Sequence, residues 1–372
     1  MKKENLIEEL SPEEIEAAKL EKDKDKKRRR IKRKKVFRVI DRIFGFILAT
    51  GIMFGVAGLG LEYVLIKGPS PSLKETFTNT MIETRRFDFI PNIFLSEAEV
   101  AEIVAKNQYA VDGEFDTSLI KIPGTDASDG EEAVAEKPNY HYTEDEDGDG
   151  YIIEEVKRKN FMGYMITVLD PNRVFIGMPE FYGGYGMLLD QYVEKYDAIG
   201  GINGGGYFDP SGAGTGGQPN GLTIIGGECY NYGGRDSFVG FSESGIMYTG
   251  YYTYDDAVSL KIRDGVSFGP ILIYNGIPSD SSTLSSGVNP RSAIGQRDDG
   301  AVLMLCIDGR QAHSVGCTYQ DLCDIMMDYG AVNACNLDGG SSSAMYLNGE
   351  YVNRSSAGVG SSRLLPNAFL FK

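Results

Sequence analysis

An uninterrupted apolar stretch near the N-terminus places the strongest constraint on how this chain can fold. The stretch from Ile43 to Ile66 contains 24 residues and a single charge, Glu62, close to its far end. About 20 apolar residues are enough for a helix to cross the hydrocarbon core of a bilayer. Glycines within the stretch, including Gly51 and Gly55 in G-x-x-x-G spacing, are tolerated in membrane helices. We therefore expect residues 43–66 to form a transmembrane helix.

The distribution of charge around this stretch predicts its orientation. Residues 1–42 contain 16 Lys and Arg against 10 Asp and Glu, with a dense basic run at 26–35. Positive charge before a membrane helix favours the cytoplasm, so we expect a basic cytoplasmic tail, 1–42, and an extracellular remainder. The apolar stretch is long for a cleavable signal, and no convincing small-residue cleavage site follows it. The expected protein is therefore a single-pass membrane protein with an uncleaved anchor.

The remainder of the chain is acidic, with 21 basic and 43 acidic residues after position 42. Nucleic acid is an unfavourable partner for such a surface, because phosphate neutralisation requires a basic face.

Residues 67–125 contain two capping boxes, Ser72 with Glu75 and Ser96 with Glu99. A capping box marks the start of a helix, so this segment is expected to be a helical stalk. Its role stays open between a plain spacer and a docking segment for a partner.

Residues 126–150 are acidic and poor in apolar residues, which is typical of a flexible linker. Within them, Asp145, Asp147 and Asp149 precede Gly150 in the manner of a calcium-binding EF-hand loop. Neither possible register supplies both the first ligand and the glutamate at position 12. The sequence therefore predicts no complete metal site and leaves calcium binding by the linker open.

Residues 151–372 are expected to form one compact domain. Its expected fold class is α+β or mixed α/β, with a mixed sheet. Its clearest helix runs from Thr318 to Tyr329, between apolar strand-like runs at 301–307 and 331–337. This order predicts a βαβ unit with two parallel strands. Asp308 and Asp338 each follow one of these strands, so both are candidates to face one cleft.

The few histidines and the spacing of the cysteines limit which metal sites and catalytic sites the chain can form. Only His141 and His313 occur, and neither a CxxC pair nor an HExxH motif is present, so we expect no zinc and no cofactor. Five cysteines are spread through the domain, and whether any of them pair stays open. A serine hydrolase would have to use His313 with a serine near Ser341. The sequence there is not a G-x-S-x-G elbow, which disfavours this alternative.

Three segments combine glycines with polar side chains in a way that suits a binding site. The first contains Asn203, Gly204 and Gly205, and the second delivers Arg291 at the entrance to a strand. The third pairs Asp308 and Arg310 with the stretch Asp338-Gly339-Gly340-Ser341-Ser342. Two glycines after a strand end let backbone amides approach a ligand, and serines can donate to an anionic group. Taken singly, each segment also fits an ordinary tight turn.

Together with Arg363 in the segment 361–368, these segments make the domain resemble the phosphodiester glycosidase family. The resemblance covers about 151–372 and is strongest at 199–208 and 289–368. Two departures are modest: Tyr207-Phe208 stands where the family has a phenylalanine pair, and Ser341 stands where it has a third glycine. The resemblance implies hydrolysis of a sugar whose anomeric carbon is linked to phosphate. It implies nothing about the anchor, stalk or linker.

The residue types are compatible with that reaction. Arg291, Arg310 and Arg363 can offer planar forks to a phosphate, and Asp338 or Asp308 can supply a carboxylate beside a developing oxocarbenium ion. We expect a glycan containing sugar phosphate, in a cell-envelope polymer or exopolysaccharide, as the substrate. A non-catalytic module that binds anionic envelope glycans is the alternative. The sugar, its acceptor, the stereochemical outcome and the oligomeric state stay open at this point.

Overall fold

The computed structural model describes residues 12–84, 87–105, 114–122, 140–209, 214–280, 284, 286–358 and 360–372. The chain divides into two compact units, Met1–Leu65 and Ile66–Lys372. Most of the first unit belongs to helix α1 (Pro12–Lys67). The part of α1 from Lys19 to Lys67 is long and apolar enough to cross a membrane, as residues 43–66 predicted. A membrane span and an N-terminal signal sequence both meet this test of length and composition.

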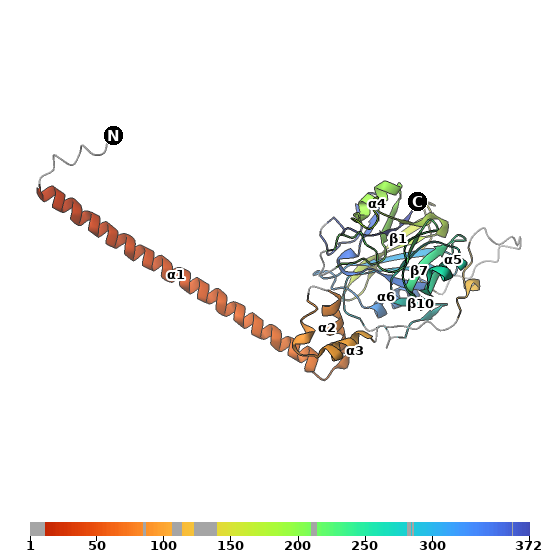
Figure 1. Ribbon diagram of the computed structural model, residues 1–372, viewed down its shortest axis with the longest axis horizontal. Coiled ribbons are helices and arrows are strands. Elements are labelled where there is room, and N and C mark those ends of the chain that lie inside the picture. The colour runs from red at the N-terminus through yellow and green to blue at the C-terminus, as the bar shows by residue number, and fades with distance from the viewer. Residues whose placement is uncertain are drawn as a thin grey trace. The chain divides into compact units, whose positions relative to one another are not determined.

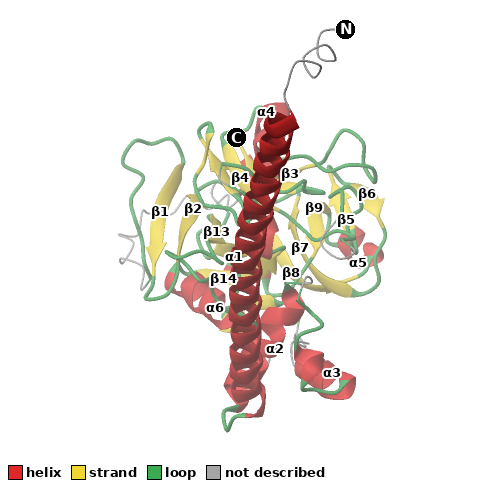
Figure 2. Ribbon diagram, turned by 90° about the vertical axis from the view of Figure 1, so that its left-hand side faces the viewer, coloured by secondary structure: helices red, strands yellow, loops and turns green. Residues whose placement is uncertain are grey.

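Three antiparallel sheets make up most of the second unit (Figure 1). The largest has seven strands in the order β1 (Tyr151–Lys157), β2 (Met162–Val168), β13 (Val302–Ile307), β12 (Arg291–Arg297), β14 (Ala331–Leu337), β10 (Ile271–Tyr274) and β11 (Ile277–Pro278). Figure 2 shows β1, β2 and β13 side by side at one end of this sheet.

The two smaller sheets have five strands each. One runs β16 (Glu350–Tyr351), β15 (Met345–Leu347), β4 (Gly200–Asn203), β17 (Ala368–Phe371) and β3 (Val174–Gly177). The other runs β6 (Glu228–Asn231), β5 (Thr223–Ile225), β9 (Ile262–Ser267), β7 (Asp236–Ser242) and β8 (Met247–Tyr252). Short helices α4 (Leu189–Tyr196) and α5 (Tyr254–Ser259) flank them.

Strand β13 shows why its sequence is apolar throughout. Val302, Met304 and Cys306 enter a core shared with the two smaller sheets. The alternate residues Leu303, Leu305 and Ile307 pack instead into a second core with helix α6 (Tyr319–Asp328). Successive side chains of a strand point to opposite faces, so a strand covered on both sides must be apolar at every position.

Helix α6 begins and ends where its sequence predicts. Thr318 is the N-cap and forms a capping box with Asp321, and each residue's side chain accepts from the other's backbone N–H at 3.1 and 2.8 Å. The strands on either side, β13 and β14, lie within one residue of the predicted bounds. The mixed α and β composition of the domain is therefore confirmed.

Two features of the predicted topology differ in the structure. Strands β13 and β14 run parallel to each other, but β12 lies between them and is antiparallel to both. All paired strands of the described residues are antiparallel, so the predicted mixed sheet is wrong there. The reason is that β12 connects to β13 through a short turn at Asp298–Gly300 and takes the place beside it.

The predicted stalk packs with the domain in the second compact unit. Helices α2 (Pro71–Glu83) and α3 (Glu97–Ala105), with the short 3-10 helix η1 (Pro91–Ile93), share a small core formed by Ile66, Leu95, Val100 and Ile103. The capping box of Ser96 and Glu99 is present, whereas α2 is capped by Ser70 instead of Ser72. Pro71 accounts for this shift, because proline favours the first helical position.

Two further segments before residue 151 also lie against the domain. Phe115 packs on the rings of Tyr248 and Tyr274, with ring centroids 4.5 and 5.8 Å apart. Lys121 donates its backbone N–H to the carbonyl of Asp298 at 2.7 Å. In the predicted acidic linker, the backbone N–H of His141 donates to Asp328 at 2.7 Å. Residues 126–139 of that linker lie outside the described residues.

Candidate active site

The candidate site lies where strand β12 begins and strands β13 and β14 end. Arg291, the first residue of β12, is paired with Ile307, and the next residue, Ser292, is paired with Leu337. This register brings Arg291 beside the residues that follow β13 and β14. A cleft of about 700 Å³ opens at this edge. It is lined by Glu83, Thr84, Phe87, Tyr207, Asp209, Phe268, Asn289, Arg291, Arg310, Tyr319, Asn336, Asp338, Gly339, Gly340, Ser341, Ser342, Ser356, Ala357 and Arg363.

The stretch from Asp338 to Ser342 is held at the cleft by its backbone. The carbonyl of Asp338 accepts from the side-chain amide of Asn203 at 2.7 Å, and its N–H donates to the carbonyl of Gly204 at 3.1 Å. Gly340 donates its N–H to Pro290 at 2.8 Å and has a φ of +65°. Its missing side chain would lie 3.4 Å from the Arg310 guanidinium. That distance is an ordinary van der Waals contact, so it is the left-handed backbone conformation that favours glycine at this position.

Asn203 acts behind this stretch and does not line the cleft. It is fully buried, and its side-chain oxygen accepts from the Ser292 hydroxyl at 2.7 Å and from the Ala344 N–H at 3.1 Å. Gly204 and Gly205 are buried beside Asn367, whose side-chain oxygen would lie 2.2 Å from a Cβ on Gly204. Asn203, Gly204 and Gly205 were predicted to bind substrate, but the structure places them behind the lining of the cleft, where they connect the segments that form it.

Arg291 is a buried cation at the wall of the cleft. Its side chain is 4% exposed and lies 4.0 Å above the ring of Tyr319. Its Nη2 donates to the carbonyl of Gly287 and to a carboxylate oxygen of Glu83, both at 2.7 Å. Burial by itself lowers the pKa of Arg291, but Tyr319 and Glu83 raise it overall, above its ordinary value. The guanidinium is therefore charged at any physiological pH.

Arg310 and Arg363 reach the same cleft from other elements. Arg310 has a φ of +58° and donates to the side-chain oxygen of Asn289 at 2.8 Å. Arg363 forms an ion pair of 2.8 Å with Asp209 and lies 5.2 Å from the centre of the Tyr207 ring. It also donates to the hydroxyl of Ser341 at 3.4 Å. The three arginines predicted from sequence all line one cleft together with Asp338.

Asp308 has a different environment from Asp338 and does not line the cleft. Its side chain is 2% exposed. One carboxylate oxygen is 2.9 Å from His313 Nε2, and the other accepts from the N–H of Arg354 at 2.9 Å and from Asn353 at 3.2 Å. These bonds tie the end of β13 to the loop that follows β16. The two aspartates therefore do not form a pair across the cleft in this structure.

Neither histidine lines the cleft. His313 is bonded to Asp308, and His141 is 2.7 Å from Glu154 at another face of the domain. A Ser-His-Asp arrangement needs the serine and the histidine within hydrogen-bond reach of each other. The position of His313 gives no support to a serine hydrolase built around Ser341.

The polar cleft residues that sequence reasoning did not select include Glu83, Asn289, Asp209 and Tyr319. Asn289 and Asp209 lie next to segments that the sequence analysis selected, so their position beside those segments could have indicated a role in the site. Tyr319 follows the N-cap of α6 and looks like an ordinary helix residue. Glu83 comes from the last turn of α2, and nothing local in the sequence relates that helix to Arg291 more than 200 positions later.

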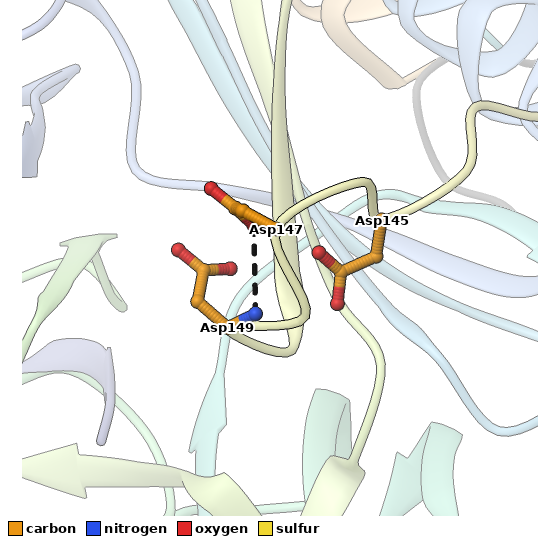
Figure 3. Close-up of side chains that lie close together, drawn as sticks. All are labelled: Asp145, Asp147 and Asp149. Atoms are coloured by element: carbon orange, nitrogen blue, oxygen red, sulfur yellow. Dashed lines mark hydrogen bonds between the residues drawn. The ribbon is translucent and has the colours of Figure 1, made fainter.

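The acidic loop before β1 brings three carboxylates together (Figure 3). Oxygens of Asp145, Asp147 and Asp149 all lie within 4.8 Å of one another. The Asp145 side chain accepts from the N–H groups of Gly148 and Gly150 at 2.9 and 3.0 Å. These bonds form a compact turn at the entrance to β1, which accounts for the spacing of the aspartates without a ligand.

Comparison with known proteins agrees with the sequence segments. Residues 196–372 match the phosphodiester glycosidase family, which confirms the resemblance. The chain is 32% identical over 164 residues to the SPbeta prophage-derived uncharacterized protein YomE of Bacillus subtilis strain 168. That match covers 41% of this chain but only 26% of YomE, so the chain spans about a quarter of that relative.

Solved structures show a similar fold. The catalytic domain of zebrafish N-acetylglucosamine-1-phosphodiester alpha-N-acetylglucosaminidase, solved auto-inhibited by its pro-peptide, gives a TM-score of 0.51 at 20% identity. The match covers 59% of this chain and 81% of that chain. A hypothetical protein from Synechocystis gives a TM-score of 0.47 at 15% identity, covering 60% and 62%. The likeness to the zebrafish domain establishes a shared fold.

Proposed function

From the match of residues 196–372 to the phosphodiester glycosidase family, we propose that this protein hydrolyses a sugar-1-phosphodiester linkage. The observation that carries the proposal is that Arg291, Arg310 and Arg363 line one cleft together with Asp338. Arginine is suited to phosphate because its planar fork matches two oxygens at once. Arg291 and Arg363 already pair with Glu83 and Asp209 in this cleft, and Asp338 would be the strand-end carboxylate beside the reacting anomeric carbon.

The proposed reaction breaks the bond between the anomeric carbon and the phosphate oxygen. Water supplies the new hydroxyl of the sugar, and the phosphate leaves as a monoester. Positive charge develops at the anomeric carbon in the transition state, and the Asp338 carboxylate would stabilise it. A phosphate monoester has a second pKa of about 6, so it leaves more readily than an alcohol. The site therefore needs a strong general acid less than an ordinary glycosidase does.

The setting of the reaction is part of the same proposal. Helix α1 contains a stretch long and apolar enough to anchor the protein, and the basic residues before that stretch favour a cytoplasmic N-terminus. We infer that the domain faces the outside of the cell and acts on a sugar-phosphate polymer of the envelope or an exopolysaccharide. The alternative is a module that binds such anionic glycans without cleaving them, since the same arginines would serve binding alone.

Hydrolysis of UDP-N-acetylglucosamine in water enriched in oxygen-18 tests this proposal. A glycosidase releases free N-acetylglucosamine and UDP, with the heavy oxygen on the sugar. Attack of water at the sugar-linked phosphorus instead would release unlabelled N-acetylglucosamine and put the heavy oxygen on UDP, and attack within the diphosphate would release the sugar phosphate and UMP; either result would contradict the proposed bond. Incubating the same protein with isolated envelope polymers extends the assay to the natural substrate class. Binding of sugar phosphates without turnover in either assay would favour the non-catalytic alternative.

A further inference from the structure

Three large aromatic side chains beside the cleft are exposed to solvent. Phe181, Tyr185 and Phe208 are 72%, 68% and 64% exposed. A folded chain usually buries such side chains, because each can remove about 150–250 Å² of surface from water. A single exposed ring needs no explanation, but several at one place mark a binding surface. We call these three side chains the aromatic rim.

Phe208 lies directly at the wall of the cleft. Its two neighbours in the chain, Tyr207 and Asp209, both line the cleft and are both buried. Consecutive Cα atoms are about 3.8 Å apart, so the backbone of Phe208 belongs to the same wall. Asp209 is in turn fixed by its ion pair of 2.8 Å with Arg363. The exposed Phe208 ring therefore borders the arginine-lined cleft.

The segment 214–218 joins Phe208 to the loop that carries the other two rings. The Phe208 N–H donates to the carbonyl of Gln218 at 2.8 Å, and the Gly183 N–H donates to the carbonyl of Gly217 at 2.9 Å. Tyr185 itself is opposite this segment in an antiparallel bridge. The rings of the rim therefore come from backbone segments that are direct neighbours in the fold.

Close packing holds the loop 181–186 in place. A Cβ on Gly217 would lie 2.1 Å from the carbonyl oxygen of Gly184, so the two backbones meet because neither residue has a side chain. The ring of Tyr182 packs on that of Tyr230, with centroids 5.3 Å apart. A ligand that binds exposed rings on a backbone held in this way has less chain to order.

The chemistry of the rim complements that of the cleft. The cleft offers arginines to a phosphate, whereas the rim offers uncharged ring faces. A sugar ring carries C–H groups on its faces and hydroxyls around its edge, so an aromatic ring can cover the C–H groups and leave the hydroxyls in water. Because the rim borders the cleft that would hold the scissile linkage, sugars that reach the rim belong to the same glycan chain.

We propose that the aromatic rim binds the sugar units that continue from the scissile linkage, so that a glycan chain is preferred to a small phosphodiester. This inference rests on the proposed function, which places the scissile linkage in the cleft with Asp338. A pyranose has two faces, so three rings outside the cleft can hold more than one sugar unit. The rim acts on substrate binding and takes no part in bond cleavage.

Hydrolysis of two substrates of different length by the full chain in detergent tests the proposal. One is an isolated envelope glycopolymer, and the other is the methyl phosphodiester of N-acetylglucosamine 1-phosphate, which contains the linkage without further sugars. Replacing Tyr185 and Phe208 together by alanine should lower kcat/KM for the polymer at least about tenfold and for the methyl diester less than about twofold. An equal loss on both substrates, or no loss on the polymer, would overturn the proposal.

The matched control is Tyr142→Ala, because Tyr142 is also exposed but lies far from the cleft. The Arg297 guanidinium is 5.4 Å from the centre of its ring, at the end of β12 opposite Arg291. This variant should leave both rates unchanged. Phe208→Tyr keeps a flat ring and should retain most of the activity on the polymer, whereas Phe208→Leu should not. Full polymer activity in Phe208→Leu would contradict stacking on sugars.

Binding without turnover separates this proposal from the proposed function. Co-sedimentation with the insoluble polymer measures retention of the protein and requires no cleavage. Retention that falls in the double alanine variant, although no protein hydrolyses either substrate, would leave the rim standing and refute the glycosidase. A wild-type dimer that becomes a monomer in the variant, with unchanged retention, would make the rim a contact between two copies of the chain and refute the proposal.

Discussion

Asp338 and Asp308 occupy equivalent positions after two parallel strands, yet only Asp338 lines the cleft. Their positions at one sheet edge were predictable, because the alternation and length of the strands defined where each strand ends. The direction in which each carboxylate points was not predictable. It depends on partners far along the chain, such as Arg354 and Asn353 for Asp308, and no local pattern connects them. The same holds for Asn203, which the sequence placed in the binding set and the structure places behind it.

Replacing Asp308 by asparagine should therefore affect stability more than catalysis. The buried carboxylate accepts from Arg354, Asn353 and His313, and the amide nitrogen of asparagine cannot accept such bonds. Hydrogen bonds to a charged group contribute about 1.5–3 kcal/mol each, so we expect a loss of roughly 2–4 kcal/mol in the free energy of unfolding. The kcat should fall less than about tenfold. Denaturant unfolding and turnover check both expectations.

Asp324→Asn is a matched control, since this aspartate is exposed on α6 and its loss should change the free energy of unfolding by less than about 0.5 kcal/mol. A folded, fully stable Asp308→Asn protein whose kcat is at least a hundredfold reduced would contradict the assignment. That result would return Asp308 to the catalytic pair considered from the sequence.

At the scale of helices and strands, local sequence signals predicted individual elements, but they did not predict which strands pair. The capping box at Thr318 and the apolar runs around it predicted α6 and its two strands to within a residue. That β12 lies between those strands was not predictable, because strand pairing is decided by contacts remote in sequence. The capping signals also predicted helices at α2 and α3. In the sequence, Glu83 in the last turn of α2 looks like a solvent-exposed residue, so its contact with Arg291 could not be predicted.

The segments that precede residue 151 should contribute to the stability of the domain. Ile120 and Ile122 are each 6% exposed, and Phe115 packs on Tyr248 and Tyr274. Burying one large apolar side chain stabilises a fold by about 1.5–3 kcal/mol. A protein of residues 114–372 should therefore melt at least about 5 °C above one of residues 151–372. Calorimetric melting compares them, and equal Tm values would show that 151–372 is the complete folding unit.

For the whole molecule, the division of charge and apolar residues is the dominant feature. Sixteen basic residues precede the apolar stretch that begins at Ile43, and an acidic remainder follows it. Composition predicted this division directly, because it depends on no contact between distant residues. It could not predict that the stalk packs with the domain, since that depends on the fit between α2 and the loop at Gly287.

Orientation in the membrane follows from the same division. We expect a tag placed after Lys372 to be digested when protease is added to intact cells, because the basic N-terminal side favours the cytoplasm. A tag placed before Met1 serves as the control and should survive until the cells are lysed. Protection of the C-terminal tag in intact cells would reverse the proposed orientation and remove the envelope polymer as the substrate.

The central claim is that the Asp338 carboxylate stabilises the transition state of sugar-1-phosphodiester hydrolysis, and kcat of Asp338→Asn tests it most directly. Asparagine preserves the volume of the side chain and removes its charge. With UDP-N-acetylglucosamine at saturation, kcat should fall at least about a hundredfold, equivalent to about 2.7 kcal/mol of transition-state stabilisation. The variant must first match the Tm of the wild type, since Asp338 also accepts a hydrogen bond of 3.0 Å from Gly339. A folded Asp338→Asn protein with near-normal kcat would contradict the account.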